Sequence, residues 1–371
     1  MKVVCNRERL LAAFQTAASV APNRSPKPIL QNVKMEVQGD QATLLATDLE
    51  IGIRVEVPGV ECESPGSAIL SIARFGQILR ESSDEKLYIE ATEKQILVRG
   101  DRSEFKLSGE GPEGFPNVAQ FQEAKYHEVS ARLLRELIRR TVFATDNESS
   151  RYALGGVLLE FEDKKVVAVG TDGRRLAKME GPANSVGGHG SSETTTIVPT
   201  RAMQLLERAL SDDDGDVLVS ARANEILVKT PRVTIYARLL EGRFPRWRDV
   251  FPSRTDAAKI EMIVGPFYAA VRQARIVTSE ESKGVDFTFH NGMVVLAGHA
   301  AELGESHIEL PIAYEGAEVG IALDPSYVID FLKVLDAEKT FTLEVKDSES
   351  AAVCSTDDGY GYVIMPLARD R

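Results

Sequence analysis

Cysteine and long apolar runs are scarce in this 371-residue sequence. Only three cysteines occur, Cys5, Cys62 and Cys354, and their odd number and wide spacing disfavour a disulfide framework and favour a reducing compartment. No apolar run approaches the roughly 20 residues of a membrane-spanning helix, and the segment Met1–Asn6 lacks the apolar core of a signal peptide. These absences predict a cytoplasmic protein without a membrane segment.

Sequence signatures of catalysis, metal binding and nucleotide binding are also missing. The five histidines form no HExxH pair and no zinc-spaced pair with cysteine, and neither a GxxxxGK[ST] nor a GxSxG motif occurs. One GxGxxG match, Gly109–Gly114, is followed by Phe115-Pro116 instead of a helix, so it cannot offer a helix N-terminus to a pyrophosphate. The acidic run Asp212–Asp216 lacks the spacing of an EF-hand. We therefore expect no metal, no cofactor and no catalytic residues.

What the sequence does contain is a threefold repeat with a spacing of roughly 120–130 residues. Its clearest block is a turn with two strands, at residues 28–57, 152–181 and 282–311. Alternating apolar residues such as Val33 and Met35 indicate strands with one buried face. A helix is expected before and after each block, and the six are Arg7–Val20, Ile72–Ser82, Ala131–Thr145, Thr200–Leu210, Phe267–Thr278 and Pro325–Asp336.

The repeat predicts an α+β fold of three structurally similar domains, each with two helices packed on antiparallel sheets. The expected domains are residues 1–126, 127–256 and 257–371. Asp324 before Pro325 fits the N-cap and first turn of a helix. The repeat by itself is also compatible with a scaffold that binds only proteins.

Charge is distributed unevenly along the chain. The formal net charge is −12, which taken alone argues against nucleic acid as a partner, because phosphate binding needs Lys and Arg. Yet the six expected helices and their caps contain thirteen Lys or Arg and only six Asp or Glu. Arg132, Arg135 and Arg139 recur on one helix face. If all helices faced a common channel, the channel would attract DNA phosphates without reading bases, and the acidic exterior would repel them.

Several motifs resemble the bacterial DNA polymerase III beta subunit family, in order and from Met1 to the last few residues. Gly170–Ala177, reading GTDGRRLA, is similar to the family's TDG(H/Y)RLA motif. The other similar segments are PILQNV at 28–33, ATDLE at 46–50, RYALGG at 151–156, IVP at 197–199, EGRFP at 241–245 and MPL at 365–367. A phosphate-handling enzyme built on Thr171–Arg175 is an alternative, although no convergent catalytic set accompanies that segment.

The resemblance implies a non-catalytic sliding clamp. In this family, two three-domain subunits join head to tail into a homodimeric ring whose helices line the central hole. The ring encircles duplex DNA without sequence specificity. The implied partners are a second copy of the chain, the replicative DNA polymerase, the clamp loader, and other polymerases and repair proteins that carry a short clamp-binding motif with apolar anchors.

The resemblance also implies three sets of site residues. The partner-peptide pocket would use Leu154, Thr171, Gly173, Arg174, Arg175, Leu176, Pro245, Val250, Val363, Ile364, Met365, Pro366 and Leu367. Family position and helix charge together assign DNA contacts to Arg24, Arg135, Arg139, Tyr152, Arg201, Arg272 and Arg275. The dimer interface would use Arg74, Arg102, Phe105, Leu107, Ile276, Val277, Glu302 and Glu305.

The sequence departs from the family pattern at four places. Arg174 stands where the family often has His or Tyr, Asp249 where some members carry Arg, and Ala153 where a second tyrosine is usual. The ending Leu367–Arg371 is longer than the usual one. The first, second and fourth departures bear on which peptides the pocket prefers.

Overall fold

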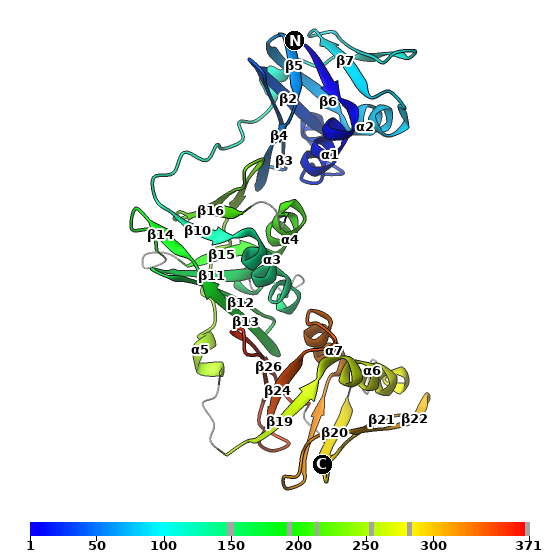
Figure 1. Ribbon diagram of the computed structural model, residues 1–371, viewed down its shortest axis with the longest axis vertical. Helices are drawn as coiled ribbons and strands as arrows, with labels where there is room; N and C mark the ends of the chain where they lie inside the picture. Colours follow the sequence, from blue (N-terminus) through cyan, green and yellow to red (C-terminus); the bar gives the residue numbers. More distant parts are fainter. Residues whose placement is uncertain (147–151, 191–194, 212–214, 252–255, 280–283, 368–371) are drawn as a thin grey trace. The chain divides into compact units, whose positions relative to one another are not determined.

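The computed structural model describes residues 1–146, 152–190, 195–211, 215–251, 256–279 and 284–367. The chain forms two compact units, residues 1–132 with 183–239 and residues 133–182 with 240–371. Each unit is described by itself below, as unit 1 and unit 2 (Figure 1).

Unit 1 contains two antiparallel sheets. The smaller has the strand order β5-β1-β7-β8-β9, formed by Val60–Ser64, Lys2–Asn6, Lys86–Ala91, Gln95–Arg99 and Glu104–Ser108. The larger has the order β14-β10-β16-β17-β18-β4-β3-β2-β6, formed by Asn184–Val186, Tyr126–Ser130, Asp216–Ala221, Glu225–Lys229, Val233–Arg238, Ile51–Val57, Gln41–Thr47, Asn32–Gln38 and Gly66–Ser71.

The larger sheet of unit 1 joins two repeats edge to edge. Strand β18 pairs with β4 in a register that places Ile235 opposite Ile53. Both side chains are buried, so the junction is held by backbone hydrogen bonds and by apolar packing. Gly52 of β4 also lies in this junction. A Cβ at this position would come within 2.9 Å of a Val118 methyl group, so the junction has little room for a larger residue.

Unit 2 is built in the same way. One sheet contains the strands β11-β12-β13-β26-β25-β24-β19 in that order, formed by Gly156–Glu162, Lys165–Thr171, Arg175–Pro182, Tyr360–Ile364, Ala352–Ser355, Thr340–Val345 and Ala258–Ile263. The other has the order β22-β21-β20-β23, formed by Gly304–Pro311, Met293–Ala300, Val285–His290 and Val319–Leu323. Strand β13 pairs with β26, which again joins two repeats edge to edge.

The predicted helices are confirmed, with different ends. They are α1 (Arg7–Ala18), α2 (Ile72–Glu81), α3 (Ala131–Arg139), α4 (Thr200–Ala209), α6 (Val264–Ala274) and α7 (Pro325–Lys333). The stretches predicted to continue α3 and α6 instead tighten into the short helices η3 (Val142–Ala144) and η6 (Arg275–Val277). The predicted cap holds, because the Asp324 carboxylate accepts a hydrogen bond from the Ser326 N–H at 2.8 Å.

The remaining elements are short. They are β15 (Thr196–Pro199), α5 (Trp247–Val250), η1 (Pro28–Gln31), η2 (Pro112–Gly114) and η4 (Tyr152–Leu154). The GxGxxG match at Gly109–Gly114 ends in η2, which has a single turn, so the interpretation as a loop is confirmed. No helix within the described ranges has both the length and the apolar character needed to cross a membrane.

The strand orders support the predicted threefold repeat. The series β2-β3-β4, β11-β12-β13 and β20-β21-β22 occupy equivalent places in three sheets, as do β7-β8-β9, β16-β17-β18 and β24-β25-β26. The fold is therefore a mixture of helices and antiparallel sheets repeated three times, as predicted. The boundaries at 126/127 and 256/257 remain a proposal.

A buried pair of histidines joins the segment after β14 to β10, at the edge of the larger sheet of unit 1. The Nδ1 atoms of His127 on β10 and of His189 after β14 lie 2.6 Å apart, and His189 Nε2 accepts a hydrogen bond from the Ala221 N–H at 2.9 Å. Burial, with His127 as a second cause, lowers the pKa of His189 below its usual value. The folded chain therefore binds protons at this site less readily than the unfolded chain does.

This pair predicts a loss of stability in mild acid. Because the unfolded chain takes up the proton preferentially, the free energy of unfolding falls as the pH drops through the unfolded histidine pKa of about 6.5. Glutamine stays neutral over this range. The urea midpoint of the His189→Gln variant should therefore change less between pH about 7.5 and about 5.5 than the midpoint of the unmodified protein does. An equal shift in both proteins would refute this role for His189.

Candidate functional site

The TDG segment forms a hydrogen-bonded turn between β12 and β13. The Thr171 hydroxyl donates to the Arg175 carbonyl at 2.7 Å, and the Asp172 carboxylate accepts from the N–H groups of Arg174 and Arg175 at 2.9 and 3.0 Å. Gly173 has a φ of +88°, which favours glycine there. These contacts fix the course of the backbone into β13.

The same turn recurs between β3 and β4. The Thr47 hydroxyl donates to the Ile51 carbonyl at 2.8 Å, and the Asp48 carboxylate accepts from the Glu50 and Ile51 N–H groups. Leu49 has a φ of +82° at the position of Gly173. A feature repeated in two domains as a backbone turn is structural, so the hypothesis of a phosphate-handling enzyme at Thr171–Arg175 finds no support.

The Arg175 side chain makes several hydrogen bonds within unit 2. Its Nε donates to Asp172 at 3.0 Å, one terminal nitrogen donates to Asp330 at 2.6 Å, and the other donates to the Phe143 carbonyl at 2.8 Å. Its guanidinium also lies 4.4 Å from the centre of the Tyr327 ring. Arg175 thus ties the turn to α7, while the neighbouring Arg174 is exposed.

The β13–β26 pairing brings several residues of the predicted peptide pocket side by side. Arg175 lies opposite Ile364 and Leu176 opposite Val363, and the Met365 N–H donates to the Arg174 carbonyl at 2.9 Å. Leu176, Val363 and Ile364 are buried, whereas Met365 is 46% exposed. Leu176 and Val363 lie opposite each other and share one face of the sheet, where they would form the floor of the predicted pocket, while Ile364 points to the other face.

The segment around α5 brings two further residues of the predicted pocket, Pro245 and Val250, toward the same sheet. Pro245 is exposed before α5, and Val250 is exposed at the last position of α5. The Trp247 indole N–H of the same helix donates to Glu160 of β11 at 3.3 Å. The Phe251 ring approaches Gly361 of β26 so closely that a Cβ there would lie 2.8 Å from it. Leu154 is buried beside β11. Neither α5 nor its anchoring to Glu160 was predicted from the sequence.

The arginines assigned to DNA lie on helices and in one loop. Arg139, Arg201, Arg272 and Arg275 are exposed, as is Arg24 in the loop after α1, while Arg135 is half-buried. The Arg201 guanidinium already makes contacts within the chain, because it pairs with Asp48 and donates to the Val20 carbonyl. Arg139 pairs with Glu136 at 3.0 Å. The side chain of Tyr152 lies outside the part of the chain that the structure describes.

The residues assigned to the dimer interface flank two sheet edges. Phe105 and Leu107 lie on β9, the outer strand of its sheet, and Arg102 precedes it, while Arg74 is exposed on α2. In unit 2, Glu305 lies on β22, also an outer strand, with Glu302 just before it. Ile276 and Val277 belong to η6, which packs beside β22. Phe105 is 36% exposed and Ile276 77%, so apolar surface lies at both edges.

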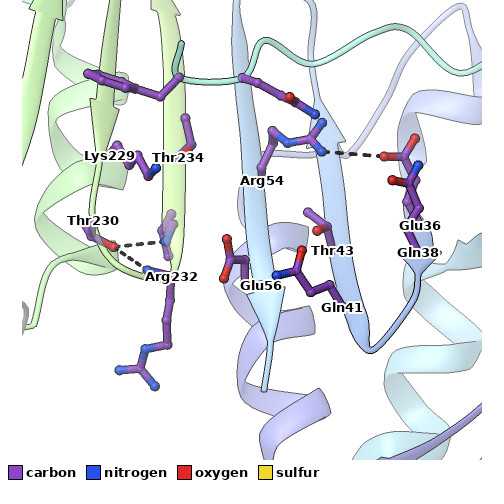
Figure 2. Close-up of a pocket in the computed structure, with 13 residues that line it drawn as sticks. Glu36, Gln38, Gln41, Thr43, Arg54, Glu56, Lys229, Thr230, Arg232 and Thr234 are labelled. Atoms are coloured by element: carbon purple, nitrogen blue, oxygen red, sulfur yellow. Dashed lines mark hydrogen bonds and ion pairs between the residues drawn. The ribbon is translucent and has the colours of Figure 1, made fainter. Parts of the chain in front are cut away.

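A polar groove of about 280 Å³ crosses the β4–β18 junction of unit 1 (Figure 2). Charges of both signs line it, with Arg54 within 3.6 Å of Glu36 and donating to the Val118 carbonyl at 3.3 Å. Lys229 and Arg232 share the groove with Glu56. Because these positive and negative charges offset one another, we do not propose the groove as an anion-binding site.

Within the described ranges, no group of three or more His, Cys, Asp or Glu side chains is placed to hold a metal ion. Burial raises the pKa of the Cys5 thiol to about 12, which makes it unreactive near neutral pH.

Comparison with known proteins identifies the family of this chain. Family models for the N-terminal, central and C-terminal domains of the DNA polymerase III beta subunit match residues 1–119, 128–246 and 248–368. The chain belongs to the DNA polymerase III beta subunit family. The three matches follow one another along the chain, as the three repeats do.

Individual relatives agree with the family. A beta sliding clamp from Pseudomonas putida is 31% identical over 375 residues, which cover 99% of this chain and all of the relative. The crystal structure of the DNA polymerase III beta subunit from Pseudomonas aeruginosa is 28% identical, covers 100% of both chains and has a TM-score of 0.89. A Pseudomonas aeruginosa sliding clamp bound to griselimycin, also 28% identical with 100% of both chains covered, has a TM-score of 0.91.

Arg175 gives a prediction with a matched control next to it. Arg175→Met removes hydrogen bonds to two carboxylates and a carbonyl, so the free energy of unfolding should fall by about 2–4 kcal/mol. Arg174→Ala, at an exposed side chain, should change it by less than about 0.5 kcal/mol. Urea titration followed by circular dichroism measures both, and similar losses in the two variants would rule out this role of Arg175.

Proposed function

We propose that this chain is a cytoplasmic, non-catalytic DNA sliding clamp that works as a closed homodimeric ring. The ring encircles duplex DNA without reading its sequence and tethers DNA polymerases and other partners through a peptide pocket. The observation that carries the proposal is the succession of three matches to the clamp family along nearly the whole chain.

Strand pairing supports closure of the ring. In each of the two junctions within the chain, the last strand of one series pairs with the last strand of the other, β18 with β4 and β26 with β13. The remaining last strands are β9 and β22, and both are outer strands. Pairing β9 of one copy with β22 of another repeats the junction, and a head-to-tail contact of this kind gives a ring if it closes.

The charge on the helices supports DNA as the occupant of the hole. Exposed arginines on α3, α4 and α6 contrast with a net charge of −12 for the whole chain. Contacts of this kind bind phosphates and carry no base specificity. This contrast favours a clamp over a scaffold that binds only proteins, because such a scaffold needs no segregation of positive charge.

The pocket is proposed to hold the partner motif over the β13–β26 floor. Buried Leu176 and Val363 would lie beneath a leucine or phenylalanine anchor, and Met365 offers a flexible apolar side wall. The replicative polymerase, the clamp loader and repair proteins are the partners proposed for it. Exposed Arg174 at the rim favours peptides with an acidic residue nearby.

Retention on DNA tests the function directly. A clamp loaded onto nicked circular DNA by a loader and ATP should stay bound through a high-salt wash, because topology and not affinity retains it. Linearising the same DNA should release it quickly, because the ring slides off the ends. The control is linear DNA whose ends are blocked by bound protein, which should retain the clamp. Equal retention on circular and open linear DNA would contradict the proposal.

A further inference from the structure

The outer strand β9 presents backbone groups at alternate residues. The Gly109 N–H donates to the Lys94 carbonyl at 2.9 Å, at the end of the ladder between β9 and β8. Because residues bonded to the neighbour alternate with residues facing outward along an antiparallel strand, the backbone groups of Glu104 and Lys106 point away from β8. Within the described part of the chain, no other strand pairs with β9 on that side.

The outer strand β22 presents backbone groups in the same way. The Ile312 N–H donates to the Gly292 carbonyl at 2.8 Å, at the end of the ladder between β22 and β21. By the same alternation, the backbone groups of Glu305, His307 and Glu309 point away from β21. The side chains of these three residues are exposed. No strand among the described residues covers this edge.

The junction inside unit 1 shows how such edges pair in this fold. Gly52 of β4 lies opposite Tyr236 of β18. Two residues further along β18, the Arg238 N–H donates to the Glu50 carbonyl at 2.9 Å. This bond fixes which residues of the two strands face each other.

The junction inside unit 2 has the same register. Leu176 of β13 lies opposite Val363 of β26, and two residues further on the Met365 N–H donates to the Arg174 carbonyl at 2.9 Å. Leu176 is the equivalent of Gly52, because each lies opposite the threonine of its Thr-Asp turn. Two separate junctions of the chain therefore agree on one way of pairing.

The residue of β22 that is equivalent to Gly52 can be found from the strands next to both. Strands β3 and β21 each begin directly after a hairpin turn, and their seventh residues are Thr47 and His299. Thr47 lies opposite Gly52, and His299 lies opposite Glu305. Glu305 is therefore the equivalent of Gly52.

The residue of β9 that is equivalent to Tyr236 follows from a hydrogen bond. The bond donated by Gly109 at the end of the β8–β9 ladder has a counterpart in the β17–β18 ladder, where the Leu239 N–H donates to the Asn224 carbonyl at 2.9 Å. Counting back three residues from each donor makes Lys106 the equivalent of Tyr236.

Pairing β9 with β22 in the register of the internal junctions places Lys106 opposite Glu305 and Glu104 opposite His307. All four residues have outward backbone groups, so each pair can exchange the two hydrogen bonds of an antiparallel ladder. Lysine then lies opposite glutamate, and a histidine that can donate a hydrogen bond lies opposite the other glutamate.

Other registers lack this match. Sliding the strands by two residues places Glu104 opposite Glu309 in one direction and opposite Glu305 in the other, and like charges directly opposite are destabilising. Sliding by one residue turns Phe105 to the other face of the sheet and leaves outward backbone groups without partners.

The apolar side of the contact agrees with the same register. Phe105 lies opposite Ser306, whose hydroxyl donates to the Ala274 carbonyl at the end of α6 at 3.2 Å. Ser306 therefore faces the helix side of its sheet, where Ile276 and Val277 of η6 lie beside β22. Phe105 is thus directed toward the two residues already assigned to the interface.

Interactions within one chain do not oppose this pairing. Lys106 lies 3.2 Å from Glu104, and Glu305 lies 3.2 Å from His299. All four side chains are exposed. Pairs between exposed side chains are weak, so these residues can change partners when two copies meet.

We propose that charge sets the register in which β9 of one copy pairs with β22 of another, with Lys106 opposite Glu305 and Glu104 opposite His307. The inference rests on the proposed function, because it concerns the contact that closes the ring. Backbone pairing alone would accept several registers, and repulsion between glutamates excludes the two nearest ones.

Disulfide trapping tests the register in the full-length chain carrying Cys62→Ser. Lys106→Cys with Glu305→Cys should link two chains under mild oxidation, because Cα atoms of such opposite residues lie about 5.5 Å apart. Two control pairs represent the shifted registers, Lys106→Cys with His307→Cys and Glu104→Cys with Glu305→Cys. Both should link much less, as read by electrophoresis without reductant, because diagonal neighbours lie about 7–8 Å apart.

Charge reversal tests the role of the ion pair. Lys106→Glu should raise the dissociation constant of the dimer about tenfold, because it places two glutamates opposite each other. Adding Glu305→Lys should restore the dimer, whereas adding Glu309→Lys instead should not. Sedimentation of fluorescently labelled protein at low concentration measures all three variants.

The outcomes separate the register from the ring. A dimer that links better through a control pair, or that Glu309→Lys restores as well as Glu305→Lys does, would overturn the register and leave the ring intact. A dimer that links through none of the three pairs would overturn the β9–β22 contact and the inference with it. An unmodified protein that sediments as one chain would instead refute the proposed ring.

Discussion

Edge-to-edge pairing of antiparallel strands is the interaction on which the rest of the molecule depends. Strand β18 pairs with β4, and β26 pairs with β13, so that strands of two repeats form one continuous sheet at each junction. Each junction satisfies backbone hydrogen bonds that a sheet edge would otherwise expose, and it buries apolar side chains such as Ile53 and Ile235. The same geometry leaves β9 and β22 as outer strands. Pairing of these two strands between copies, as proposed above, would repeat the junction that joins the repeats within the chain.

The functional surfaces depend on these junctions and on the turns beside them. The turn that contains Asp172 directs β13 toward β26 and orients Arg175 toward Asp330 of α7. Because the proposed pocket floor is part of the β13–β26 pair, any change that loosens the junction should also alter the proposed pocket. The Thr-Asp motif that stands out in the sequence is therefore important for shape, and its repetition at Thr47 and Asp48 gives the same explanation in a second domain.

Much of this fold could be predicted from the sequence, because its signals are local or repeated. Helix periodicity predicts α1 to α7 except α5, whose four residues are too few to show a period. The threefold repeat predicts equivalent strands. Long-range partners could not be predicted. Arg175 reaches Phe143 and Asp330 because the fold brings together segments that are far apart in the sequence, and His127 meets His189 for the same reason.

The central claim is that β9 of one copy pairs with β22 of another, with Phe105 and Ile276 packed across the contact. Sedimentation equilibrium of the intact 40.6 kDa chain measures this most directly, beside the double variant Phe105→Ala with Ile276→Ala. The account predicts a species of two chains for the intact protein and a shift toward single chains for the variant, because both apolar side chains are exposed in the isolated chain. An intact protein that sediments as one chain, or a variant that stays dimeric at low concentration, would contradict it.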